Sequence, residues 1–159
     1  MLERVVLVSS AFALSATFVV AQANPRGEAK VKLAGKTVAI DYGRPSLKGR
    51  DMIGRLEVGK SWRMGADAET TLKTEADLAF GSVPVPKGSY VLEATKVAAD
   101  QWTLNVKSGS EKVADVPLTF SRTPASVETL TIELKGEKGA GEFQMSWGDM
   151  VLKAPLTAK

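Results

Sequence analysis

Apolar and polar residues alternate in short segments along most of the chain, separated by Gly, Pro, Asn, Asp or Ser. The clearest segment is 101–107, where Trp102, Leu104 and Val106 fall on one face and polar residues fall on the other. A period of two residues is that of a β-strand with one face buried and the other in water. The pattern therefore predicts an all-β protein made of antiparallel strands.

Further segments with this alternation follow one another along the chain. The run Pro84-Val85-Pro86-Lys87-Gly88 predicts a turn, because proline lacks the N–H that a sheet needs and glycine tolerates a positive φ. We therefore expect a single antiparallel β-sandwich, Greek-key or jelly-roll-like. The expected strands are 30–34, 37–42, 70–74, 78–80, 89–95, 101–107, 116–120, 130–134, 143–147 and 150–154.

The N-terminal segment has a different character from the rest of the chain. Arg4 precedes an apolar run from Val5 to Val20, and Ala21-Gln22-Ala23 supplies small residues at a cleavage position. This arrangement is typical of a cleavable signal peptide. Serine and threonine interrupt the run, which disfavours a membrane anchor. We expect a signal peptide at 1–23 and one β-sandwich domain at 24–159, exported to the periplasm or the cell exterior without a stable membrane span after processing.

Composition restricts the chemistry that the chain could perform. It has no His and no Cys, which excludes His-based acid–base catalysis, thiolate nucleophiles and ordinary zinc sites. The net charge is +3, and it does not change when residues 1–23 are removed, because they hold one acid and one base. So small a charge does not indicate a nucleic-acid partner. We expect no metal site and no cofactor.

Charged residues are concentrated between residues 43 and 77. The stretch 43–63 has six basic residues against two acidic ones, and 67–77 has four acids against one lysine. In the simpler interpretation the two stretches face each other and form ion pairs. In the alternative interpretation, some of the basic residues bind a small anionic ligand or a glycan, and the indole of Trp62 provides a stacking surface. The candidate ligand-binding residues are Arg44, Lys48, Arg50, Trp62, Arg63, Asp67 and Glu69.

The same region resembles a known family. Its motifs Tyr42-Gly43-Arg44-Pro45, Lys48-Gly49-Arg50 and the GKSWRMGA run at 59–66 are similar to those of the bacterial secreted family catalogued as domain of unknown function 2911. The resemblance covers roughly residues 36–154 and implies an exported protein, but no particular reaction. At 65–70 the acid is displaced by one residue from the family pattern, so a role of the family's glutamate need not pass to Glu69.

Three classes of function remain open on the sequence. The lack of His and Cys favours a non-enzymatic exported module, and no catalytic residue is assigned. A carboxylate-dependent hydrolase of the cell envelope would have to use Asp41, Asp51, Asp67 or Glu69, but nothing in their spacing shows that any two of them converge. The third class is a structural envelope protein without a small ligand. The partner is unknown in each case.

Overall fold

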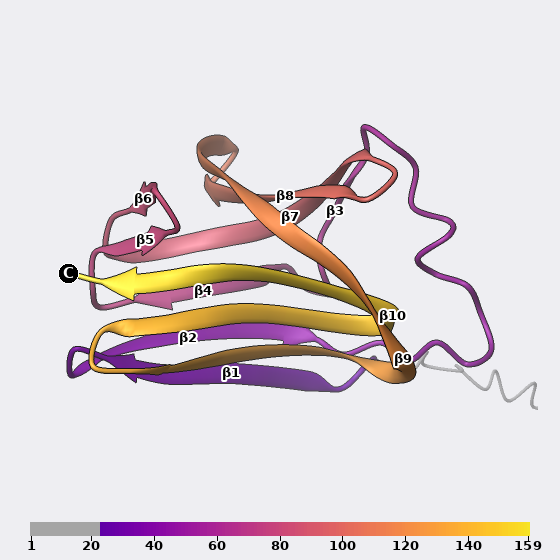
Figure 1. The fold of residues 1–159 in the computed structure, drawn as a ribbon, viewed down its shortest axis with the longest axis horizontal. Helices are drawn as coiled ribbons and strands as arrows, with labels where there is room; N and C mark the ends of the chain where they lie inside the picture. The colour runs from indigo at the N-terminus through magenta and orange to yellow at the C-terminus, as the bar shows by residue number, and fades with distance from the viewer. Residues whose placement is uncertain (1–22) are drawn as a thin grey trace, which may run out of the picture.

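The computed structural model describes residues 23–159, in which every regular element is a β-strand (Figure 1). The predicted signal peptide lies outside the described residues, apart from Ala23. Residues 23–159 contain no helix long and apolar enough to cross a membrane. The strands are β1 (Arg26–Leu33), β2 (Lys36–Gly43), β3 (Ser61–Trp62), β4 (Thr70–Thr74), β5 (Leu78–Phe80), β6 (Val83–Val85), β7 (Gly88–Ala98), β8 (Gln101–Ser108), β9 (Glu111–Glu137) and β10 (Ala140–Ala158).

The strands pair antiparallel in the order β1-β2-β4-β7-β8-β9-β10-β5-β6, with β3 added to β7. The all-β, antiparallel prediction is thus confirmed. Three steps in this order are not sequential: β2 to β4, β4 to β7 and β10 to β5. The strand β3 pairs with β7, while β5 and β6 pair with each other and only β5 pairs with β10. The sheet curls so far that β1 lies beside β9 (Figure 1). It therefore encloses a single hydrophobic core.

The β9–β10 hairpin forms the corner of the curled sheet. β9 has 27 residues and β10 has 19, where the sequence predicts shorter separate strands. Their register shifts on both sides of Gly148, which has a φ of 61° that glycine adopts without steric cost. The N-terminal part of β9 pairs with β8, and after the bend its C-terminal part runs beside β1 (Figure 1).

The alternating positions form the core, as predicted. Trp102 and Trp147 are each 3% exposed, and Leu104 and Val106 are fully buried. The turn predicted at Pro84–Gly88 is wrong for Pro84, which lies in β6, whereas Pro86 and Lys87 do connect β6 to β7. Within residues 23–159, β6 pairs with β5 alone at the end of the strand order, so it is an edge strand. Proline is tolerated there because its missing N–H deprives no neighbouring strand of a hydrogen bond.

Candidate functional site

The start of the basic stretch continues the sheet beyond β2. Leu47 donates its N–H to the Glu128 carbonyl, and the Pro45 carbonyl accepts the N–H of Leu130, both at 3.0 Å. These bonds connect the end of β2 to β9, although the two strands lie far apart in the strand order. This part of the family motif therefore closes the curled sheet.

The arginines of the basic stretch bind backbone carbonyl groups. Arg44 donates through Nε to the carbonyl of Leu130 at 3.2 Å. Arg50 donates to the carbonyls of Leu47 and Ser46, at 2.9 and 3.1 Å. Both side chains therefore satisfy acceptors in a segment with few sheet partners. Fewer of their N–H groups remain available to a ligand.

The expected ion pairing between the basic and acidic stretches is wrong. In the part of the chain that the structure describes, no ion pair joins residues 43–63 to residues 67–77. Arg63 donates instead to the backbone carbonyl of Asp67. The Asp67 carboxylate accepts the N–H of Asn24 at 2.8 Å, and Glu75 accepts that of Thr37 at 2.8 Å. The charged side chains hold the loops by binding backbone groups.

Two of the predicted ligand-binding residues meet at one hollow. Arg44 and Lys48 line a volume of about 280 Å³ together with Ser46 and residues 23–25. The other five candidates, Arg50, Trp62, Arg63, Asp67 and Glu69, do not line it. Trp62 is partly buried and stacks on Trp147, so one face of its indole is covered. The structure thus does not unite the seven residues in one site.

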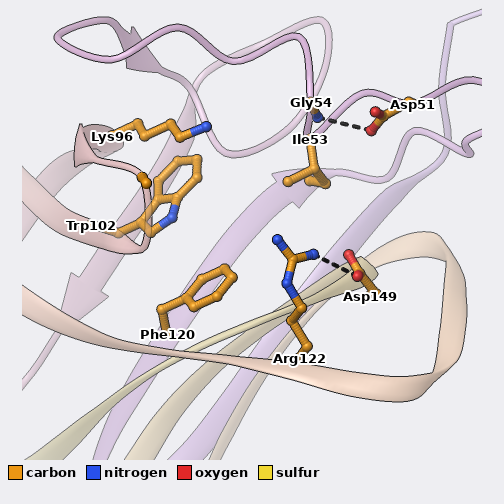
Figure 2. Close-up of a pocket in the computed structure, with 9 residues that line it drawn as sticks. Asp51, Ile53, Gly54, Lys96, Trp102, Phe120, Arg122 and Asp149 are labelled. Atoms are coloured by element: carbon orange, nitrogen blue, oxygen red, sulfur yellow. Dashed lines mark hydrogen bonds and ion pairs between the residues drawn. The ribbon is translucent and has the colours of Figure 1, made fainter.

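A second cavity, of about 150 Å³, lies beneath the turn at residues 51–54 (Figure 2). Segments distant in sequence form its walls: this turn, the end of β7, the start of β8 and the corner of the β9–β10 hairpin. Two cations, two acids and two aromatic rings face it. Its lining comprises Asp51, Ile53, Gly54, Lys96, Ala99, Trp102, Phe120, Arg122 and Asp149.

Local hydrogen bonds hold the turn over this cavity. Asp51 accepts the N–H of Gly54 through Oδ1 at 2.8 Å. The Lys96 ammonium donates to the Leu56 carbonyl at 3.2 Å and lies 5.9 Å from the centroid of the Trp102 ring. Lys96 therefore connects the loop to β7 and β8, and its charge is placed at the cavity beside an aromatic face.

Arg122 forms the opposite side of the cavity. Its Nη1 donates to Asp149 Oδ2 at 2.6 Å, across the β9–β10 pair. The hydrogen bond and charge of Asp149 raise the pKa of Arg122 above its ordinary value, so the guanidinium stays charged. The side chain is 61% exposed, which leaves it room to turn without repacking the core. Figure 2 shows its guanidinium across the gap from Trp102.

The N–H of Trp102 is the most unusual group at the cavity. The side chain is 3% exposed, and Nε1 is buried without a hydrogen-bond partner within residues 23–159. Figure 2 shows this nitrogen on the ring edge that faces Phe120 and Arg122. Burying a donor without an acceptor costs about 1–3 kcal/mol, and folded proteins contain few such groups. By contrast, Trp147 donates its N–H to the Glu128 carbonyl at 3.2 Å.

The sequence indicated part of this cavity only. Asp51 appeared among the loop acids, and Trp102 was assigned to the core, where its ring does lie. Alternation places the ring on the inner face, but it does not say where the N–H points. Lys96, Arg122 and Asp149 belong to no motif in the sequence, so no sequence signal united them.

Comparison with known proteins gives one result. Residues 24–156 match the family described as "Protein of unknown function (DUF2911)". The chain belongs to this family. The match confirms the resemblance seen in the loop motifs. In this member of the DUF2911 family, the match includes every lining residue of the cavity beneath residues 51–54 and, except for Ala23, of the hollow at Arg44 and Lys48. No match was found among the curated proteins or the solved structures.

Proposed function

We propose that the protein is an exported, non-enzymatic module that binds a small ligand in the cavity beneath residues 51–54. The observation that carries the proposal is the buried N–H of Trp102, which lacks an acceptor among the described residues and lies on the ring edge toward Phe120 and Arg122, two residues of the cavity lining. A ligand with an acceptor atom would satisfy it, and Lys96 and Arg122 stand nearby with further donors. Export is supported by the apolar N-terminal run and its Ala21-Gln22-Ala23 site.

The two acids of the cavity favour binding over hydrolysis. A carboxylate-dependent hydrolase needs one acid that can donate a proton. Asp149 is paired with Arg122 at 2.6 Å, and Asp51 accepts the N–H of Gly54 at 2.8 Å. Both carboxylates are therefore already engaged in contacts within the protein. Within residues 23–159, no group of three or more acids lies where it could hold a metal ion.

The proposal is tested by a thermal-shift screen of the purified protein against sugars, nucleotides, organic acids and divalent cations. A ligand at a hundred times its dissociation constant adds about 2.7 kcal/mol to the free energy of unfolding. We expect a stabilising ligand whose effect is lost in Arg122→Gln. The effect should persist in Arg55→Gln, which removes the same charge from the loop outside the cavity lining.

Two results would contradict the proposal. If the stabilising effect survived Arg122→Gln but disappeared in Arg44→Gln, the ligand would bind at the hollow of the basic loop. If no compound stabilised the protein, the structural role in the envelope would be the better description. The screen therefore distinguishes three cases: a ligand bound in the cavity, a ligand bound at the basic loop, and a protein that binds no small ligand.

A further inference from the structure

One hydrogen-bond donor at the cavity beneath residues 51–54 is buried without a partner, and the two cations of the lining have further N–H groups. A guanidinium has five N–H donors and an ammonium three. Among the described residues, Arg122 donates one to Asp149, and Lys96 donates one to a backbone carbonyl. Trp102 adds an N–H that lacks a partner there. The two carboxylates of the lining, Asp51 and Asp149, accept from Gly54 and Arg122, and neither accepts from the Trp102 N–H. The group missing from the cavity is therefore an acceptor.

Charge and geometry indicate which acceptor fits best. Lys96 has no carboxylate partner among residues 23–159, whereas the charge of Arg122 is offset by Asp149. A planar carboxylate brings one negative charge, and its two oxygens accept several hydrogen bonds at once. One oxygen can take the indole N–H of Trp102 while the other takes free N–H groups of Arg122. A hydroxyl or a neutral carbonyl has fewer lone pairs and no charge.

The size and walls of the cavity restrict the rest of the ligand. Its volume is about 150 Å³, and an apolar cavity of that volume binds benzene in another protein. Ile53, Phe120 and the Trp102 ring supply apolar surface. A short aliphatic or single-ring body would contact them. Because Nε1 of Trp102 is shielded from solvent, a ligand reaches it only when a side chain of the lining moves, and the exposed side chain of Arg122 has room to do so.

We infer that the cavity binds a small monocarboxylic acid. Its carboxylate lies between the N–H of Trp102 and the guanidinium of Arg122, and its apolar body lies against Ile53 and Phe120. This inference rests on the proposed function and adds the class of ligand. It places the binding site at residues outside the motif that first identified the family.

The inference is tested by nuclear magnetic resonance on protein labelled with ¹⁵N at its tryptophans. The indole N–H signals of Trp62, Trp102 and Trp147 are observed, and Trp102→Phe identifies the one that belongs to Trp102. Butyrate and benzoate are the probes, with butyramide and benzamide as neutral controls of similar size and shape. We expect both acids to move the Trp102 signal downfield in a saturable way, and both amides to leave it in place. The Trp147 signal should stay constant, since its N–H is bonded to Glu128.

Two variants test the assigned contacts. Arg122→Gln should weaken carboxylate binding about tenfold or more, because it removes charge-assisted hydrogen bonds. Arg55→Gln should bind as the parent does, because its side chain lies outside the lining. Equal affinity in Arg122→Gln and the parent would overturn the inference. Trp102→Phe keeps a ring in place but removes the donor, and it should also bind the acids more weakly.

The remaining outcomes show whether the carboxylate inference fails alone or together with the proposed function. If the amides moved the Trp102 signal as much as the acids, the carboxylate inference would be wrong while small-ligand binding stood. The same holds if the acids had no effect but the wider screen found a ligand lost in Arg122→Gln. If neither experiment found a ligand, the inference and the proposed function would both be wrong.

Discussion

The indole rings of Trp62 and Trp147 are stacked, with 5.6 Å between their centroids and 13° between their planes. Trp62 lies in the two-residue strand β3, which pairs with β7, and Trp147 lies in β10. Trp147 is buried and also donates to the Glu128 carbonyl at 3.2 Å. The stack therefore joins the family's loop motif to the core. It also covers the ring face that a glycan would need on that side.

Trp147→Phe is expected to destabilise the protein more than Trp102→Phe. The first change removes one of the two N–H groups that the Glu128 carbonyl accepts, the other being that of Leu47, and weakens the stack with Trp62. The second removes a donor that lacks a partner among the described residues. The free energies of unfolding, measured by urea denaturation, should differ by about 1 kcal/mol or more. Alanine at either position should cost about 3–5 kcal/mol. Equal losses in the two Phe variants would show that the Trp102 N–H has an acceptor in the folded protein.

Gly43→Ala should be more damaging than Gly54→Ala. A Cβ at Gly43 would lie 2.0 Å from the backbone oxygen of Ala66, and one at Gly54 would lie 2.1 Å from Oδ2 of Asp51. The first contact requires the backbone to move, whereas an exposed carboxylate can rotate. We expect losses of about 3 kcal/mol for Gly43→Ala and about 1 kcal/mol for Gly54→Ala, by thermal unfolding. The reverse order would mean that the turn over the cavity is the more rigid of the two.

Asp115 should make stability depend on pH in the acid range. Its carboxylate accepts from Lys112 and from Asn105, both at 2.7 Å. The Lys112 hydrogen bond, with a smaller effect of Asn105, lowers the pKa of Asp115 below its ordinary value of 3.8, although burial opposes the shift. Because the pKa is lower in the folded state, this stabilisation is present above pH 3.8 and is lost as the pH falls through the folded pKa.

Asp115→Asn should therefore reduce the loss of stability below pH 3.8. Near neutral pH it should cost less than about 1 kcal/mol, because the side chain is 44% exposed and the charge is screened. Urea denaturation of parent and variant across this pH range measures the effect. Parallel pH profiles for the two proteins would show that Asp115 titrates alike in the folded and unfolded states.

The contact of Asn24 with Asp67 should distinguish the processed protein from a longer one. The Asn24 nitrogen lies 2.8 Å from Asp67 Oδ2, and the expected cleavage after Ala23 would convert it into an α-ammonium. The resulting exposed ion pair should add up to about 1 kcal/mol. Protein that begins at Asn24 should then melt higher, at about pH 6, than protein with one extra glycine before Asn24. Asp67→Asn should abolish the difference.

N-terminal sequencing of the exported protein should begin at Asn24, and an intact Met1 would refute the cleavage.

Alternation identified most of the strands and their inner faces, but not β3 or β6. In a strand, every second side chain points to the same side, so Trp102, Leu104 and Val106 had to share one environment wherever the strand was placed. The loop motif around Tyr42–Pro45 likewise identified the family, because that match is local. Both depend on residues that are close together in sequence, and both agree with the folded protein.

Contacts between distant segments were decided by the tertiary structure. The charge runs suggested ion pairs, but Arg63 and Asp67 instead bind backbone groups, because loop carbonyls and N–H groups without sheet partners lie closer to them. Pro84 could enter a strand only because β6 has a neighbour on one side. The cavity exists because the curl of the sheet and the corner at Gly148 bring Trp102 and Arg122 together from separate strands. Neither alternation nor charge encodes that proximity, since it depends on how far the whole sheet bends.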